Sequence, residues 1–189
     1  MRVIFKVLEF LRSEIDEHLM SRFEVSESIA VLSNLVDRDG TPAANIDDKI
    51  VLTLAKVERV AAVAPPLASY RPDGNQSMLT EKTLPLNLSL LISATSKHYP
   101  EALKHLSETL TFLQACSFFT SENASKLPDE VQRIAVDLVD LDFQQLNNLW
   151  GIFGNRYIPS VLFNLRLVLL TRRDSADSVS PIRGIDTQL

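Results

Sequence analysis

The strongest constraint on the fold is a period-two alternation of apolar residues in two segments, 84–96 and 160–170. The alternating apolar residues are Leu86, Leu88, Leu90 and Ile92 in the first segment and Val161, Phe163, Leu165 and Leu167 in the second. Such alternation places apolar side chains on one face of a β-strand. The chain is therefore expected to contain a sheet with a buried face.

The remaining periodic segments predict the order α-β-β-β-α-β-α-β. Apolar residues at steps of three and four indicate helices over 4–19, 99–113 and 143–153. Short β-branched or alternating runs indicate strands over 29–36, 50–58 and 134–141. Asp142 and Gln145 have the spacing of a capping box, and Gly154 is placed to end the third helix.

Turn residues suggest how the strands connect. Asp39-Gly40-Thr41-Pro42 is a turn signal, so we expect segments 29–36 and 50–58 to form a hairpin. Hairpin neighbours pair antiparallel, and we expect the helices to cover one side of the sheet. The prediction is a single α+β domain with a mostly antiparallel sheet of about five strands.

The domain is expected to span residues 1–173, with two irregular additions. Segment 64–83 contains tandem prolines and no periodicity, and we interpret it as an extended internal arm. Segment 174–189 is rich in Ser, Asp, Gly and Pro and is predicted to be a flexible tail. Segment 117–129 is predicted to be a polar loop.

Composition excludes several functional classes. The chain has 19 basic and 24 acidic residues among 189, a formal net charge of -5, which disfavours nucleic-acid partners. The single cysteine, Cys116, excludes an internal disulfide and favours a reducing compartment. Lys6 and Glu9 interrupt the apolar N-terminal stretch, so no signal peptide is expected.

No constellation of residues predicts catalysis, a cofactor or a metal site. His98 and His105 are about 10 Å apart along a helix, too far to share one ion with Glu101. His18 stands alone and is expected at the surface. We interpret Cys116 as a small buried hydrophobe and Asp137 as part of the wet face of a strand. The chain is not expected to be an enzyme.

Two stretches together resemble the tail-terminator, or cap, family of contractile injection systems, which are phage-tail-like particles with an inner tube, a sheath and no head. The first stretch is Leu84-Pro85-Leu86-Asn87-Leu88 followed by Tyr99-Pro100-Glu101-Ala102-Leu103. The second is Leu149-Trp150, Phe153-Gly154, Tyr157, Pro159-Ser160-Val161 and Phe163. The resemblance covers residues 4–170 and implies a twisted sheet with flanking helices, similar to phage tail terminators.

The resemblance also implies a function and a set of partners. Such proteins form a ring, a homohexamer, on the distal end of the inner tube, where they stop tube growth and anchor the last sheath layer. The expected partners are further copies of the chain, the tube protein and the sheath protein, with no nucleic acid and no small-molecule substrate. We expect assembly in the cytoplasm, after which the chain is part of the particle.

The residues proposed for protein contacts are aromatic or basic residues in the arm, near the last turn and at the start of the tail: Tyr70, Arg71, Trp150, Tyr157, Arg172 and Arg173. Trp150 and Tyr157 are expected to brace the turn into the last strand, with an interface role as the alternative. Two other functions stay open at this point. One is a neck or tail-completion connector of a headed contractile phage, and the other is a small ligand-binding or enzymatic α+β domain.

Overall fold

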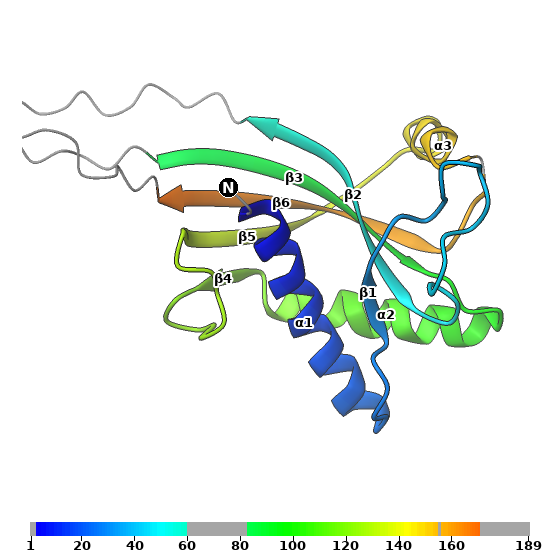
Figure 1. Ribbon diagram of the computed structural model, residues 1–189, viewed down its shortest axis with the longest axis horizontal. Helices are drawn as coiled ribbons and strands as arrows, with labels where there is room; N and C mark the ends of the chain where they lie inside the picture. The colour runs from blue at the N-terminus through cyan, green and yellow to red at the C-terminus, as the bar shows by residue number, and fades with distance from the viewer. Residues whose placement is uncertain (1–2, 60–82, 155, 171–189) are drawn as a thin grey trace, which may run out of the picture.

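Two long antiparallel strands form the centre of the sheet (Figure 1), in a computed structural model that describes residues 3–59, 83–154 and 156–170. Strands β3 (Thr83–Ala94) and β6 (Ser160–Leu170) pair from Thr83 opposite Leu170 to Ser93 opposite Ser160. Both strands lie where the alternation predicted them. The arm 64–83, apart from Thr83, and the tail 174–189 lie outside the described residues.

Six strands form one sheet in the order β1-β2-β3-β6-β5-β4, and three helices accompany it. The other elements are α1 (Val3–Phe23), β1 (Ala30–Leu32), β2 (Ile50–Arg59), α2 (Tyr99–Ala115), β4 (Phe118–Thr120), β5 (Val131–Val139) and α3 (Phe143–Ile152). Every pair of neighbouring strands is antiparallel except β1 with β2. The α+β class and the mostly antiparallel sheet are confirmed.

The expected hairpin between segments 29–36 and 50–58 is wrong. Strand β1 has three residues and runs parallel to β2, with Ala30 opposite Ile50 and Leu32 opposite Leu52. The predicted turn exists, but it closes a small local loop in which the Asp37 N–H donates to the Thr41 carbonyl at 2.8 Å. A parallel pair needs a crossover connection, and residues 33–49 provide it.

The predicted polar loop 117–129 contains a sixth strand, β4. Phe119 at the centre of β4 lies opposite Ile134 of β5 and is only 4% exposed. Its ring meets Phe10 of α1 edge to face, with the centroids 5.3 Å apart. Burial of this one aromatic side chain explains why a segment with a polar sequence ends up in the sheet.

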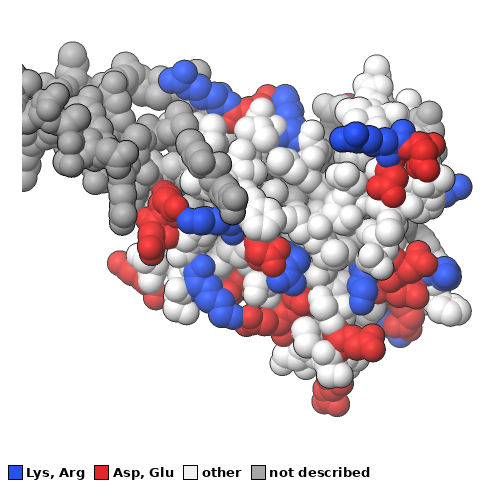
Figure 2. Space-filling view, in the orientation of Figure 1, with Lys and Arg blue, Asp and Glu red and all other residues white. Residues whose placement is uncertain are grey.

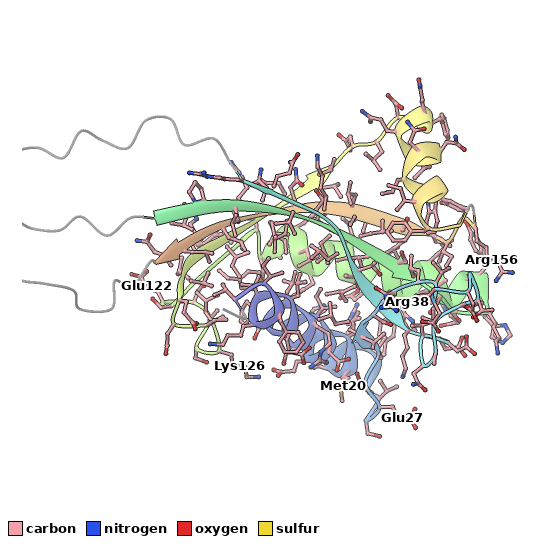
Figure 3. The ribbon with its side chains drawn as sticks, turned by 45° about the horizontal axis from the view of Figure 1, so that its top comes forward. Met20, Glu27, Arg38, Glu122, Lys126 and Arg156 are labelled. Atoms are coloured by element: carbon pink, nitrogen blue, oxygen red, sulfur yellow. The ribbon has the colours of Figure 1, made fainter. Side chains whose placement is uncertain are left out.

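Helices pack on both faces of the sheet, which corrects the expectation that they cover one side. Helices α1 and α2 bury the larger core against one face, on which Leu88, Leu90 and Leu165 are fully buried. Helix α3 packs on the other face around Trp150, with Val51 and Leu91 from the sheet. Figure 3 shows α3 and α1 on opposite sides of the strands. None of the helices within the described ranges is both long and apolar enough to cross a membrane.

Asp16 joins α1 to the start of β1. Asp16 is only 7% exposed, although its side chain is a carboxylate. One oxygen accepts the backbone N–H groups of Ile29 at 2.7 Å and Ala30 at 2.8 Å, and the other accepts the Ser28 hydroxyl and Arg12 Nη1. The carboxylate thus supplies acceptors to backbone donors at the edge of the sheet.

Replacing Asp16 with alanine leaves the N–H groups of Ile29 and Ala30 without an acceptor. Each buried donor without a partner costs about 1–3 kcal/mol, so we expect Asp16→Ala to lower the free energy of unfolding by about 2–4 kcal/mol in urea titrations. The matched control is Glu17→Ala, which removes the neighbouring exposed partner of Lys126 and should unfold close to wild type. Equal losses in the two variants would contradict the anchoring role of Asp16.

Two histidines lie between α1 and α2. His18, expected at the surface on its own, stacks on Phe112 with the ring centroids 4.6 Å apart, and its Nε2 is 2.9 Å from Glu108 Oε1. His105 meets Phe23 edge to face at 4.7 Å between centroids. Burial lowers the pKa of the His105 imidazole, an effect opposed by Glu101 and Asp48 and reinforced by Lys104.

The lowered pKa of His105 predicts a loss of stability in mild acid. The unfolded chain binds this proton more tightly, so stability falls as the pH drops from the unfolded value, about 6.5, through the lower folded value. His105→Gln should remove this component from melting temperatures measured between about pH 7.5 and about pH 5. His98→Gln, at the exposed start of α2, is the control. An unchanged pH dependence in His105→Gln would refute the assignment.

Candidate protein-docking surfaces

The described residues do not assemble a metal site. No group of three or more His, Cys, Asp or Glu side chains in residues 3–59, 83–154 and 156–170 could hold an ion. Of the residues considered from the sequence, Glu101 pairs with Lys104 at 2.7 Å and His105 packs on Phe23. Cys116 is half-buried against the main core.

Helix α3 is held in place by the predicted cap and by Trp150. The Gln145 N–H donates to Asp142 Oδ1 at 2.7 Å, and Gln145 Oε1 accepts the Asp142 N–H at 3.1 Å, which completes the capping box. Gly154 follows the helix with φ +82°, a conformation that favours glycine. Trp150 is 5% exposed and anchors the smaller core. Local sequence and one large side chain thus fix the helix on the sheet.

Trp150 and Tyr157, both proposed for protein contacts, lie together but differ in exposure. Their ring centroids are 5.6 Å apart, and Tyr157 is 63% exposed. Burial in the smaller core suits the bracing role expected for Trp150. An interface role for Tyr157 stays a prediction. Four further residues proposed for contacts lie outside the described residues: Tyr70, Arg71, Arg172 and Arg173.

The outer face of α3 is uncharged. No residue from Phe143 to Ile152 carries a charge, although 23% of the chain is charged. The exposed residues here are two apolar side chains, Phe143 at 91% and Ile152 at 76%, and the amides between them. Elsewhere on the face in view, Figure 2 shows acidic and basic side chains interspersed. Depletion of charge with exposed aromatic groups is typical of the core of a protein interface. Sequence analysis missed this face, and the uncharged run 143–152 was the available signal.

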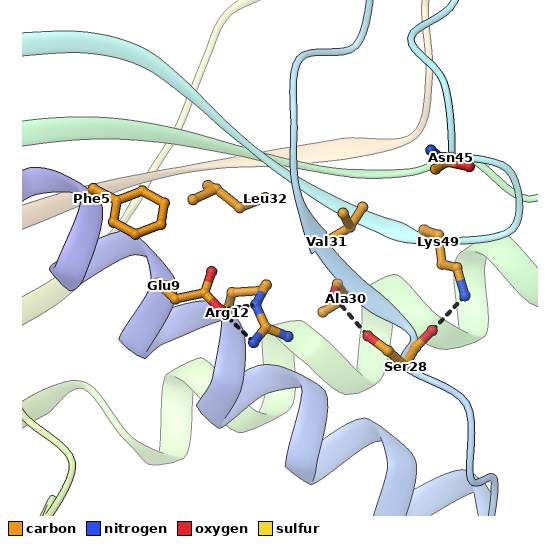
Figure 4. Close-up of a pocket in the computed structure, with 9 residues that line it drawn as sticks. All are labelled: Phe5, Glu9, Arg12, Ser28, Ala30, Val31, Leu32, Asn45 and Lys49. Carbon is orange, nitrogen blue, oxygen red and sulfur yellow. Dashed lines mark hydrogen bonds and ion pairs between the residues drawn. The ribbon is translucent and has the colours of Figure 1, made fainter.

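A second feature is a groove of about 330 Å³ between α1 and β1 (Figure 4). Phe5, which is 59% exposed, and the strand residues Ala30 to Leu32 provide its apolar lining. Arg12 contacts Glu9 at 2.6 Å on the helix side, and this hydrogen bond raises the pKa of the guanidinium. Lys49 lies at the other end and donates to the Ser28 carbonyl. The groove thus combines an apolar lining with polar ends.

A third feature is the part of the sheet that no described helix covers on the α3 side. We call it the open sheet face and define it by Asn87, Ser89, Asp137, Asn164 and Arg166. Ser89 Oγ donates to Asn164 Oδ1 at 3.1 Å, and Arg166 Nε donates to Asp137 Oδ2 at 2.8 Å. Asn87 Oδ1 is buried without a partner among the described residues. The face is polar, and four of its five defining side chains are paired across the strands.

The six-stranded sheet, with helices on both faces within the described residues, has similar folds among solved structures. The chain is similar to the sheath/tube terminator of an extracellular contractile injection system, PVC, in its extended state, with 15% identity and a TM-score of 0.51. It is also similar to the tube-terminating cap of the anti-feeding prophage, with 16% identity and a TM-score of 0.52. The fold is that of tube terminators, as the resemblance predicted.

A family model identifies the family to which the chain belongs. The model described as the Pvc16 N-terminal domain matches residues 6–184, and the chain belongs to this family. The two structural alignments cover 95% and 94% of this chain but only 63% and 60% of the solved chains, so this chain spans about three fifths of their length. Among curated proteins, none matches the chain.

The position of Trp150 in the smaller core predicts that its truncation destabilises the subunit. Trp150→Ala should lower the free energy of unfolding by about 3–5 kcal/mol, measured in denaturant. Trp150→Phe is the matched control and should lose much less stability, because phenylalanine keeps an aromatic ring in the smaller core. The Nε1 of Trp150 has no hydrogen-bond partner among the described residues, so the substitution breaks no hydrogen bond there. Normal stability in Trp150→Ala would contradict the bracing role.

Proposed function

We propose that this chain is a structural cap of a contractile, phage-tail-like injection particle. In this role it docks on the distal end of the inner tube, stops tube growth and anchors the last layer of the sheath. The observation that supports this most strongly is the family match over residues 6–184 on a chain with the fold of two tube terminators.

The proposed role is mechanical and requires no turnover. A tube grows because each ring offers the next one a heterologous surface that never closes along the axis. A cap ends this growth when one of its faces docks on the last ring and its other face offers no matching surface. Shape, apolar contact and hydrogen bonding are sufficient for such a function, and we propose no enzymatic activity.

The open sheet face is a suitable docking surface for this purpose. Its residues come from three neighbouring strands, β3, β6 and β5, and the pairs Ser89–Asn164 and Arg166–Asp137 hold side chains from all three in place. Prepaired side chains lose little conformational freedom when a partner docks, which favours binding. The uncharged outer face of α3 borders this region on the same side of the sheet.

The proposed partners are further copies of the chain, the tube protein and the sheath protein. The homohexameric ring is an expectation from the resemblance. We propose that the chain assembles in the cytoplasm and becomes part of an injection particle, as the extracellular system of the PVC terminator suggests. Contact roles for the arm 64–83 and the tail 174–189 stay predictions.

Removing the chain from the producing cell tests the proposal. Without a cap, we expect particles to lose their uniform length, or tubes to lose their sheaths, because nothing ends tube growth or holds the last sheath layer. Negative-stain electron microscopy of purified particles measures both. Expression of the wild-type chain should restore uniform length, whereas the same plasmid with an early stop codon should not.

Particles with an unchanged length distribution and intact sheaths in the absence of the chain would refute the cap function. Loss of all particles would instead indicate a role at the start of assembly. That outcome would also contradict a terminator, which acts after the tube has formed.

A further inference from the structure

We infer that Phe143 of one subunit inserts into the groove between α1 and β1 of a second copy, with Asp140 and Asp142 facing Lys49. This contact rests on the proposed function, because it would provide the lateral interface of the ring. It joins two different patches of the same chain, the exposed start of α3 and the groove beside α1.

The protruding side of the contact is the first residue of α3. Phe143 is 91% exposed, the highest value among the exposed large hydrophobic residues described. The capping box of Asp142 fixes the backbone immediately before Phe143, and Trp150 anchors the same helix about two turns further on. A large apolar side chain on a rigid helix loses little entropy on docking, and aromatic anchors of this kind dominate many interfaces.

The receiving side is apolar and large enough. The groove has a volume of about 330 Å³, whereas a cavity of about 150 Å³ is sufficient to hold benzene. Phe5 from α1 and Leu32 from β1 lie on two sides of it, as Figure 4 shows. An inserted phenyl ring would cover the ring of Phe5, which is otherwise 59% exposed. Aromatic pairs add to the stabilisation that comes from area alone.

Charge favours the same partner and sets its orientation. Asp140 and Asp142 are exposed and lie three residues and one residue before Phe143, so the protruding ring has carboxylates nearby in the chain. Lys49 at the end of the groove donates to the Ser28 carbonyl, and no carboxylate in the described ranges forms an ion pair with it. Opposite charges beside an apolar anchor fix the register of a complex more than its affinity.

The two patches lie on opposite sides of the sheet. Phe143 belongs to the helix that packs on Val51 and Leu91, whereas the groove is formed by α1, which packs on the other face. One subunit can therefore use its protruding patch on one neighbour and its groove on another. Such a heterologous contact generates rings when the rotation between subunits closes.

Oligomeric state in solution tests the contact, using the full-length chain. Phe143→Ala should weaken self-association by about 30-fold or more in Kd, the usual effect of losing an anchor residue. Ile152→Ala is the matched control, because Ile152 is 76% exposed on the same helix but lies at its other end. Sedimentation equilibrium measures both, and circular dichroism melts verify that each variant is folded.

A mixing experiment tests whether the contact is heterologous. Phe5→Ala damages the groove and leaves the protruding patch intact, whereas Phe143→Ala does the reverse. Each variant alone should be largely monomeric, but an equimolar mixture has one intact interface per pair and should form dimers that go no further. A mixture that stays monomeric, or a Phe143→Ala chain that associates like wild type, would overturn the inference. So would a wild-type chain that stays monomeric at its highest soluble concentration.

Charge reversal tests the orientation. Asp140→Lys and Lys49→Asp should each weaken association, and both together in one chain should restore it, since the pair is re-formed with opposite signs. If the double variant is folded but its association does not recover, Asp140 and Lys49 do not pair in the contact. Self-association through a different surface, such as strand pairing at the β1 edge of the sheet, would leave all these variants associating like wild type and would overturn the inference.

Failure of this contact and failure of the cap function give different results. If the Phe143→Ala chain still self-associates and still gives particles of normal length, the contact is wrong. The cap function is then judged by the removal experiment alone. If removing the chain has no effect on particles, the cap function is wrong whatever the chain does in solution.

Discussion

The carboxylate of Asp16 determines how α1 sits on the sheet, and much of the molecule depends on that placement. Helix α1 provides eight buried residues, but apolar packing alone leaves a helix free to slide and rotate on a sheet. Asp16 removes this freedom because its two oxygens accept directional hydrogen bonds from Ile29, Ala30 and Ser28. Arg12 compensates the charge from within the same helix, so the buried carboxylate is not left unpaired.

Sequence patterns predicted the parts of the fold that depend on local periodicity. Strands β3 and β6 alternate over eleven or more residues, and both were assigned correctly. The third helix was also placed correctly, because Asp142 and Gln145 form a capping box that acts over three residues. In contrast, β4 has only three residues, too few for an alternation to be seen, and it was missed. A strand was predicted over 29–36, but β1 has only three residues and its pairing direction was predicted wrongly. The positions of both strands depend on pairing with strands distant in the sequence, and the parallel direction of β1 depends on the path of the long connection that follows it.

The candidate surfaces were harder to predict than the fold, for a physical reason. A docking surface consists of residues that a helix or strand exposes together. Their exposure depends on which side chains are covered by neighbouring helices and strands. Trp150 and Tyr157 are close in sequence and in space, yet one is buried and the other exposed. The sequence places Phe143 at the start of the predicted third helix, and only the structure shows that its side chain is 91% exposed. The pairs of the open sheet face likewise require the register between β3, β6 and β5, which no local pattern encodes.

The two sides of the sheet differ in chemistry, and this difference bears on how a cap could end growth. On the side of α1 and α2, exposed charges form ion pairs such as Lys6–Glu130, Glu17–Lys126 and Lys104–Glu101. Charged groups in water resist burial, because desolvation costs more than a new contact returns unless each charge finds a partner. On the other side, α3 presents no charge and exposes Phe143. Under the proposed function, the uncharged outer face of α3 and the paired side chains of the open sheet face suit docking. The ion-paired surface around α1 and α2 suits an end that adds no further layer. A subunit with this asymmetry can dock on the end of an assembly and offer no surface on which a further layer could dock.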